Sequence, residues 1–460
     1  MVFSSLVFIY VFLPAALILY FISPMRLKNA VLLLVNLLFY GYGEPRYLLL
    51  MAGSIIINYL LARVINAAGN RKLKLTFLVL SIVVNLFALG WYKYAGLLTA
   101  TLRKLPVFTS LPIVSVLLPV GISFYTFQAM SYVIDVYRKD CEPTKNIVDF
   151  AAYISLFPQL IAGPIVRYSD VAQQMHHRAI TVEKFSYGVR LFCIGLAKKV
   201  LLANQFAVLW ESVSAEPMAM GTVWAWCGIA AYTLQIYFDF GGYSDMARGL
   251  GAMMGFDFCI NFDYPYMSSS ITEFWRRWHI SLSTWFRDYV YIPLGGSRKG
   301  TARTVCNLLI VWMLTGFWHG ADWTFLLWGL YYGILLLAEK FLLRSVLQRL
   351  PRIVRRGYTL LLVMLGWVFF ACNDWNSVCS YFRAMFSFEA GADLTQLLCW
   401  LPIGLAGAFA SVSAGKCIWK KIDHTASAQW AEMVLCVLSL LLCTASLVSG
   451  SYNPFLYFRF

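Results

Sequence analysis

Charged residues are scarce in this chain. They make up 13% of its 460 residues, whereas 60% of the residues are hydrophobic. A soluble protein carries roughly a quarter charged residues, and its apolar residues do not form runs of about 20. The scarcity of charge therefore argues against an ordinary soluble enzyme and predicts an integral membrane protein.

Several motifs of known chemistry are also missing. The sequence contains no G-x-S-x-G, no G-x-x-x-x-G-K-[ST] and no C-x-x-C. These absences argue against a serine nucleophile elbow, against nucleotide hydrolysis by this chain and against a cysteine metal site. The 11 cysteines lie mostly inside apolar runs, where we expect them to be free thiols. We expect no bound metal and no tightly bound cofactor.

Apolar segments, by contrast, recur along the whole chain. We expect an all-α, polytopic membrane protein that forms one domain over residues 1–460, with roughly 11–13 transmembrane helices and some re-entrant or interfacial helices. The segments cover residues 3–23, 30–43, 47–66, 75–98, 106–134, 147–165, 186–210, 219–240, 303–320, 323–347, 357–373, 396–412 and 430–449.

Basic residues predict how the chain lies in the membrane. The net charge is +15, the first loop carries Arg26 and Lys28, and the third apolar segment is followed by Arg71, Lys72 and Lys74. Because cytoplasmic loops are enriched in Lys and Arg, we expect these loops to face the cytoplasm and anionic lipid, with the N-terminus outside. No basic tract stands apart from the apolar segments, so nucleic acid is not an expected partner.

One region, residues 241–302, mixes charged and aromatic residues closely. It includes WRRWHISLSTWFRDYVYIPLGGS at residues 275–297. Polar backbone and charge persist at membrane depth only when they are buried in protein or line a wet cavity. We therefore predict that this region is re-entrant and builds a site inside the helix bundle.

His319 lies in the segment LTGFWHGADWTFLLWGLYYG, between two apolar stretches. An ionisable side chain there is a functional candidate, because burial keeps the imidazole neutral and able to act as a base. Asp322 follows within one helical turn and can orient the ring. Gly316 and Gly320 would let another backbone or a thin substrate approach closely. The alternative is a histidine that only joins packed helices by a hydrogen bond.

His279 is the second candidate. If residues 275–287 formed one helix, its aromatic and basic residues would leave no single apolar face, as in a re-entrant element whose arginines meet phosphates or carboxylates. An amphipathic helix anchored at the lipid headgroups is the alternative. The candidate residues around the two histidines are Trp275, Arg276, Arg277, Trp278, Asp288, Trp318 and Asp322, with Asp288 able to pair with Arg287 or Arg298.

Two carboxylates, Asp239 and Asp245, flank a Gly-Gly pair at which we expect the helix to be interrupted. Paired carboxylates can serve as an acid and a base or as a cation site. The more common arrangement is a salt bridge to buried arginines, for which Arg248, Arg276 and Arg277 are available.

The residues quoted above resemble the membrane-bound O-acyltransferase family. Supporting motifs are LPVGISFYTFQAMSYVIDVYR, FPQLIAGPIVRY, QIYFDFGGYSDMARGLGAMMGF and NFDYPYMSSSITEFWRRWHISLSTWFRDYVYIPLGGS. Within the family, the chain resembles the bacterial branch that contains alginate O-acetylation and teichoic-acid D-alanyl transfer proteins. The resemblance implies a ring of helices around a central tunnel in the bacterial cytoplasmic membrane, with His319 catalytic and His279 a second important residue.

The implied activity is acyl transfer across the membrane. We expect an acetyl group from acetyl-CoA to pass to an extracytoplasmic polysaccharide such as alginate or peptidoglycan, through a separate acetyltransferase partner of the SGNH type. His319 would remove a proton, and indole N–H groups, Arg276 or the backbone amides of Gly295 and Gly296 would stabilise the oxyanion. The candidate tunnel residues then also include Asp239 and Asp245.

The C-terminal stretch NPFLYFRF places a hydroxyl at Tyr457. Aromatic endings of this kind accompany the branch named above, and Tyr457 is a candidate to carry the acyl group transiently. The alternative is an aromatic anchor at the membrane interface.

Three other functions remain open from the sequence. D-alanyl transfer to teichoic acid from a carrier-protein thioester is the alternative within the family. A polytopic transporter also buries polar groups, although the internal repeats typical of many transporters are missing here. A catalytically silent scaffold for a soluble transferase is the third. The sequence leaves the acceptor polymer and the oligomeric state open.

Overall fold

The computed structural model describes residues 1–389, 391, 395–422, 425–450, 453 and 456. All the regular secondary structure of these residues is helical, and they form no strand. The expected all-α fold is therefore confirmed. The described chain divides into two compact units, residues 1–192 with 246–259 and residues 193–245 with 260–460.

The first unit contains the N-terminal helices. Asn70 and Asn146 begin two of them, because each side-chain oxygen accepts a backbone N–H two residues further on. The helices are α1 (Leu13–Ile22), α2 (Lys28–Gly43), α3 (Leu48–Ala67), α4 (Arg71–Leu102), α5 (Ile122–Arg138), α6 (Ile147–Ile154), α7 (Phe157–Leu160), α8 (Tyr168–His176) and the first part of α9 (Val182–Ala197).

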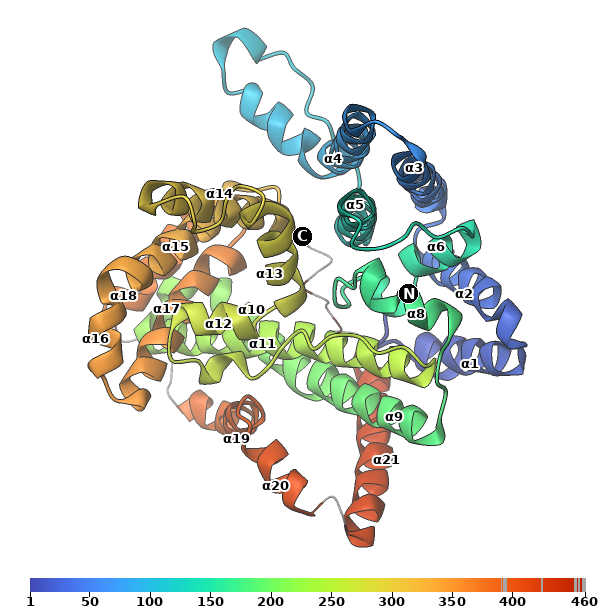
Figure 1. Cartoon of the computed structure of the whole chain (residues 1–460). Helices are drawn as coiled ribbons and strands as arrows, with labels where there is room; N and C mark the ends of the chain where they lie inside the picture. Colours follow the sequence, from blue (N-terminus) through green and yellow to red (C-terminus); the bar gives the residue numbers. More distant parts are fainter. Residues whose placement is uncertain (390, 392–394, 423–424, 451–452, 454–455, 457–460) are drawn as a thin grey trace. The chain divides into compact units, whose positions relative to one another are not determined.

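The second unit contains most of the remaining helices and both candidate histidines. In Figure 1, α14 and α15 lie side by side, with α12 and α13 drawn nearby in yellow and olive. The helices are α10 (Asn204–Ser214), α11 (Pro217–Met253, of which residues 217–245 belong here), α12 (Ile271–Arg277), α13 (Ile280–Phe286), α14 (Thr301–His319), α15 (Trp323–Ala338), α16 (Arg344–Arg349), α17 (Arg352–Ala371), α18 (Trp375–Phe386), α19 (Thr395–Ala410), α20 (Ala414–Ile422) and α21 (Ala426–Ser449).

Short helical turns of other geometry extend or connect these helices. The π-helical turns are η1 (Phe8–Phe12), η5 (Lys198–Ala203), η7 (Arg287–Tyr291) and η8 (Glu339–Leu343). The 3₁₀ turns are η2 (Met25–Leu27), η3 (Pro45–Tyr47), η4 (Pro106–Phe108) and η6 (Pro265–Met267).

Six helical segments of the described chain are long and apolar enough to cross a membrane. They are Pro45–Ala67, Arg71–Leu102, Val182–Ser214, Trp323–Arg349, Arg352–Ala371 and Ser427–Ser449. The last has only 6% of its most apolar window buried, so its Leu and Val side chains are left for lipid. The other expected spans fall in shorter, irregular or more polar segments: residues 109–121 form no helix, and residues 147–165 hold only short ones.

Large aromatic side chains form the core of the second unit. Trp224, Trp328, Trp367, Tyr232, Tyr332 and Tyr381 are each no more than 2% exposed. They belong to one buried cluster that also contains Trp275, Trp278 and Leu456. Aromatic rings bury much area with few rotatable bonds, so this core is well suited to hold polar groups in one geometry.

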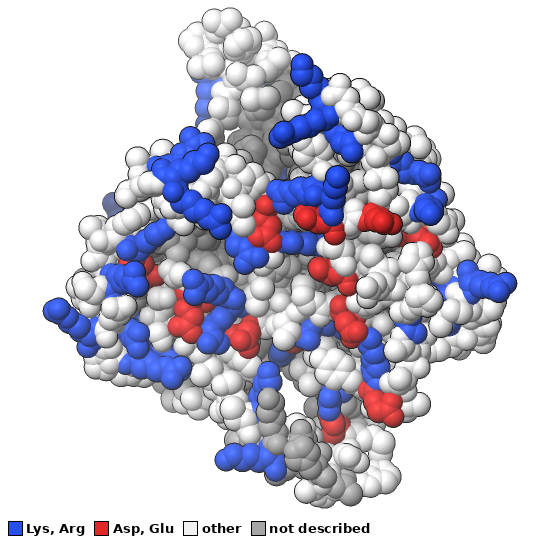
Figure 2. All heavy atoms as spheres, in the orientation of Figure 1, with Lys and Arg blue, Asp and Glu red and all other residues white. Residues whose placement is uncertain are grey.

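Basic side chains are widespread on the molecular surface. On the face shown in Figure 2, Lys and Arg cover more of the surface than Asp and Glu. One expected loop cation does not join them: Lys28 is 6% exposed, and its ammonium donates to the Tyr20 carbonyl at 2.7 Å. The same ammonium lies 4.2 Å from the centre of the Tyr20 ring.

Candidate functional site

His319 is the last residue of α14, at the tip of the α14–α15 hairpin. The backbones of the two helices approach closely because Gly316 and Gly329 have no side chain. A Cβ at Gly316 would clash with the Phe325 carbonyl, and one at Gly329 with the Trp312 carbonyl. The expected close approach at Gly316 is therefore made by another helix. Asp322 caps α15 by accepting the Thr324 N–H at 3.0 Å, and its expected role in orienting the His319 ring stays a prediction.

The His319 ring lies among aromatic rings. It is 4% exposed, and its centre is 5.0 Å from that of Trp318, 5.1 Å from Trp328 and 5.2 Å from Phe370. All three neighbours are roughly perpendicular to the imidazole. Edge-to-face packing on several sides restricts rotation of the ring, so its nitrogens keep a defined direction.

His279 lies at a break between two short helices. α12 ends at Arg277 and α13 begins at Ile280, while His279 itself has a φ of 44° in the left-handed region. The interpretation of residues 275–287 as one helix is therefore wrong. A left-handed residue reverses the local chain direction, which turns the His279 side chain into the core at 1% exposure.

Asn261 determines the protonation of His279. The Asn261 Oδ1 accepts the Ser281 N–H at 3.1 Å and the Ser281 hydroxyl at 2.9 Å, and it lies 3.2 Å from His279 Nδ1. Because a backbone N–H can only donate, this oxygen is an acceptor, so Nδ1 must carry the proton. Nε2 is then the basic nitrogen. His279 lies outside the six candidate spans, and burial lowers its pKa to about 3, which keeps the ring neutral at physiological pH.

The structure brings the two histidines together. Their ring centres are 6.5 Å apart, and the Trp318 ring contacts both, at 6.0 Å from His279 and 5.0 Å from His319. Two buried imidazoles at this spacing can face one bound substrate, and either can act as a base toward a hydroxyl.

Indole N–H groups lie beside this pair. The Nε1 atoms of Trp275 and Trp328 are buried and have no hydrogen-bond partner among the described residues. The two rings lie 5.5 Å apart, and Trp328 adjoins His319. The amides expected to serve as donors are already used, since Gly295 N–H donates to Ile292 O and Gly296 N–H to Tyr291 O, each at 2.9 Å.

The arginines of residues 275–297 do not join the histidine pair. Arg276 is exposed, and Arg277 pairs with Glu273 at 2.9 Å and with Asp263 at 3.6 Å. Asp288 pairs with Arg287 at 2.7 Å, as one of the two expected partners. Trp278 directly follows α12 and packs on Trp367 with ring centres 5.0 Å apart. Arg276 is therefore not placed as a buried oxyanion donor.

Asp239 and Asp245 form ion pairs with lysines. Lys199 Nζ lies 2.7 Å from Asp239 Oδ1, and Lys198 Nζ lies 2.7 Å from Asp245 Oδ2. The expectation that both carboxylates form salt bridges is confirmed. Their partners are lysines, whereas arginines were expected from the sequence. The expected helix break is wrong as well, because α11 continues through Gly241 and Gly242. Gly242 instead allows close packing, since a Cβ there would meet the Gly195 carbonyl at 2.7 Å.

Four groups at or near the site were not found from the sequence: Asn261, Trp328, Glu339 and the Lys198–Lys199 pair. Glu339 is 5% exposed and caps α12 by accepting the N–H groups of Ile271 and Thr272 at 2.6 and 2.9 Å. A lone Glu and two Lys inside otherwise apolar segments were the available signal, because such residues are rare in spanning helices. Tyr457 lies outside the described residues, whereas its neighbour Leu456 is described.

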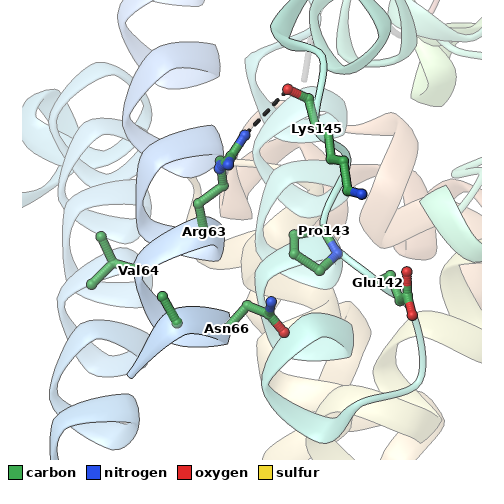
Figure 3. A pocket seen from close by; sticks show the side chains of 7 residues that line it. Arg63, Val64, Asn66, Glu142, Pro143 and Lys145 are labelled. Atoms are coloured by element: carbon green, nitrogen blue, oxygen red, sulfur yellow. Dashed lines mark hydrogen bonds between the residues drawn. The ribbon is translucent and has the colours of Figure 1, made fainter. Parts of the chain in front are cut away.

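A separate surface pocket of about 490 Å³ lies in the first unit. It is lined by Arg63, Val64, Asn66, Ala67, Glu142, Pro143 and Lys145, and Arg63 donates to the Lys145 carbonyl at 3.2 Å (Figure 3). None of the residues predicted for the site lines it.

Comparison of the sequence with known proteins finds a matching family profile and several similar acyltransferases. Residues 143–382 match the profile of the membrane-bound O-acyltransferase family. The chain is 42% identical over 487 aligned positions to a probable alginate O-acetylase of Pseudomonas putida, with 100% of both chains covered. It is 33% identical to a peptidoglycan O-acetyltransferase of Helicobacter pylori, over 84% of this chain and 80% of the relative.

A weaker likeness extends to a teichoic acid D-alanyltransferase of Streptococcus thermophilus. The identity is 30%, over 46% of this chain and 55% of the relative. The family profile covers both histidines, and the alignment to the Pseudomonas putida protein covers the whole chain. The chain is thus an acyltransferase and belongs to the membrane-bound O-acyltransferase family.

Proposed function

We propose that this protein transfers an acetyl group from acetyl-CoA, across the bacterial cytoplasmic membrane, for O-acetylation of an extracytoplasmic polysaccharide. The observation that carries the proposal is the buried pair His279 and His319, 6.5 Å apart, in a chain related over its full length to an alginate O-acetylase. The peptidoglycan O-acetyltransferase relative supports the same acceptor class.

In the proposed reaction His319 is the general base. An acceptor hydroxyl loses its proton to His319 while its oxygen attacks the thioester carbonyl and forms a tetrahedral oxyanion. The oxyanion then collapses, the C–S bond breaks, and His319 returns the proton to the departing thiolate. The products are an acetyl ester and free CoA, so atoms and protons balance. The aromatic walls exclude water and thereby protect the thioester from hydrolysis.

The neighbouring groups have distinct proposed roles. His279 presents Nε2 as an acceptor because Asn261 holds the proton on Nδ1. Because the single proton of the attacking hydroxyl goes to His319, His279 Nε2 can accept a hydrogen bond only from another O–H or N–H group of a bound substrate. The Trp328 indole N–H, buried beside His319, is the proposed oxyanion donor. A donor that is preorganised in an apolar wall needs no rearrangement when charge develops.

Transport of the acyl group needs further parts. We propose a tunnel that admits acetyl-CoA from the cytoplasm, Tyr457 as a transient acyl carrier, and a separate SGNH-type acetyltransferase that completes transfer to the polymer. The N-terminus then lies outside and the basic loops meet anionic lipid on the cytoplasmic side.

D-alanyl transfer remains a second candidate, favoured only by the teichoic acid D-alanyltransferase relative. The two functions differ in the donor. Purified protein in lipid vesicles incubated with labelled acetyl-CoA should form an acetyl ester. Exclusive use of a D-alanyl carrier-protein thioester would instead support the second candidate.

The test of the site is His319→Ala, with exposed His177→Ala as the control. Loss of the base should lower acetyl transfer by at least about 10²-fold, because general-base catalysis contributes about 10²–10⁴. Membrane abundance and thermal unfolding should match the unsubstituted protein, and His177→Ala should keep full activity. Retained transfer in His319→Ala would remove His319 from its role.

A further inference from the structure

The carboxylate of Asp239 uses its two oxygens for two different partners. Oδ1 pairs with Lys199 at 2.7 Å, and Oδ2 accepts the backbone N–H of Leu456 at 2.9 Å. Asp239 is 2% exposed and Lys199 is 1% exposed. The three groups therefore form one buried polar cluster that joins η5, α11 and the C-terminal segment of the chain.

The C-terminal segment, of which Asn453 and Leu456 are described, makes further contacts near this polar cluster. Leu456 is 6% exposed and belongs to the buried aromatic cluster that contains Trp275 and Trp328. Three residues earlier, Asn453 Oδ1 accepts the Asn204 side-chain amide at 3.4 Å, and Asn204 directly follows η5. Both described residues of the segment thus contact the part of the second unit that carries Lys199.

A buried ion pair by itself is a weak reason for such an arrangement. Removing two charges from water costs about as much as their attraction returns, and apolar residues of similar size often stabilise a core equally well. A buried backbone N–H, however, needs an acceptor, and a charged acceptor forms the stronger hydrogen bond. Lys199 compensates the charge that Asp239 needs for this task.

We propose that Lys199 and Asp239 form a clamp that holds the C-terminal segment inside the second unit. Both are positioning residues. Tyr457 is covalently next to the clamped Leu456, so the clamp limits how far Tyr457 can move from this anchor. The consequence for acyl transfer rests on the proposed function, whereas the clamp itself does not.

The test measures release of the segment in the full-length protein in detergent micelles. Carboxypeptidase Y digests from the C-terminus, and intact mass reports when residue 456 is lost. Asp239→Leu combined with Lys199→Met removes both charges and so avoids leaving one charge buried alone. We expect loss of residue 456 to become at least about tenfold faster, since a hydrogen bond to a charged group is removed.

The matched control is Asp245→Leu combined with Lys198→Met. This neighbouring ion pair has the same two charges on the same two helical segments, also at 2.7 Å. We expect the control to lose residue 456 at the rate of the unsubstituted protein. Equal rates in the unsubstituted protein and the Asp239 and Lys199 variant would overturn the proposal, as would equal acceleration in the control.

Leu456→Pro gives a second measurement that leaves the ion pair intact. Proline lacks the N–H that donates to Asp239. The variant should lose residues 458–460 to carboxypeptidase Y faster than the unsubstituted protein, a readout that needs no cleavage at the slowly hydrolysed proline, while the remaining protein still unfolds cooperatively. Unchanged loss of residues 458–460 would contradict the clamp. Acetyl transfer is measured in parallel. If the segment is released and acetyl transfer is unchanged, the clamp proposal stands, but Tyr457 has no role in the proposed function.

Discussion

At the scale of single residues, the site depends on where a few hydrogen-bond donors point. Asn261 places the proton of His279 on Nδ1, and the backbone N–H groups of Gly295 and Gly296 are already bonded. Trp328 differs from them, because its buried N–H finds no acceptor among the described residues. An unused buried donor costs free energy, which is consistent with a role during catalysis.

Trp328→Phe tests this role. Phenylalanine keeps an aromatic ring against His319 but removes the N–H, so kcat for acetyl transfer should fall by about 10²-fold, the loss typical of one oxyanion donor. KM for acetyl-CoA should change little, because the donor acts mainly in the transition state.

Trp312→Phe is the control, since the Trp312 ring lies 6.3 Å from that of Trp328 and the change removes the same volume. It should lower kcat far less than Trp328→Phe. Equal losses in the two variants would mean that packing, and not the N–H, is responsible.

At the scale of helices, much of the hairpin that carries His319 was predictable. The expected segments 303–320 and 323–347 agree with α14 and the span that begins at Trp323, because long apolar runs bounded by Gly, His and Asp leave few alternatives. The division of residues 271–286 into α12 and α13 was not predictable. Histidine adopts the left-handed region more often than most non-glycine residues, but still rarely, so the sequence does not indicate that His279 is there.

Glu339 is expected to stabilise α12 from another helix. Its carboxylate accepts two backbone N–H groups and the Thr272 hydroxyl at the start of α12. Glu339→Ala leaves these buried groups without their acceptor and should lower the free energy of unfolding by about 2–3 kcal/mol. Glu339→Gln keeps one acceptor oxygen and should lose about half as much.

Thermal unfolding in detergent ranks the stability of the unsubstituted protein, Glu339→Gln and Glu339→Ala, which should decrease in that order. Because α12 carries Trp275 beside Trp328, acetyl transfer should decrease in the same order. Unchanged unfolding in Glu339→Ala would show that the cap contributes nothing measurable.

At the scale of the whole molecule, the pattern of charge predicts the orientation in the membrane. The span Pro45–Ala67 is followed by three basic residues, Arg71, Lys72 and Lys74. Lys28 was also expected to be a cytoplasmic loop cation, but it is buried against Tyr20. The positive-inside argument therefore depends mainly on residues 68–74, where α3 gives way to the first turn of α4.

Gly69→Cys and Thr109→Cys test the orientation, because both positions are exposed and they flank the span Arg71–Leu102. A membrane-impermeant maleimide should label residue 69 only in inverted vesicles and residue 109 only in intact spheroplasts. Peptide mass spectrometry separates these sites from the native cysteines. The reverse pattern would place the N-terminus in the cytoplasm.

The sequence alone determined the class of protein, most long helices and the two histidines, because apolar runs, rare ionisable residues and family motifs are local properties of the chain. Tertiary structure decided the partners. Lys199 with Asp239, Asn261 with His279 and Glu339 with α12 are separated by 18 or more positions. Pairing over such distances depends on which helices pack together. Each polar group needs its particular partner because burial removes water as the competing ligand.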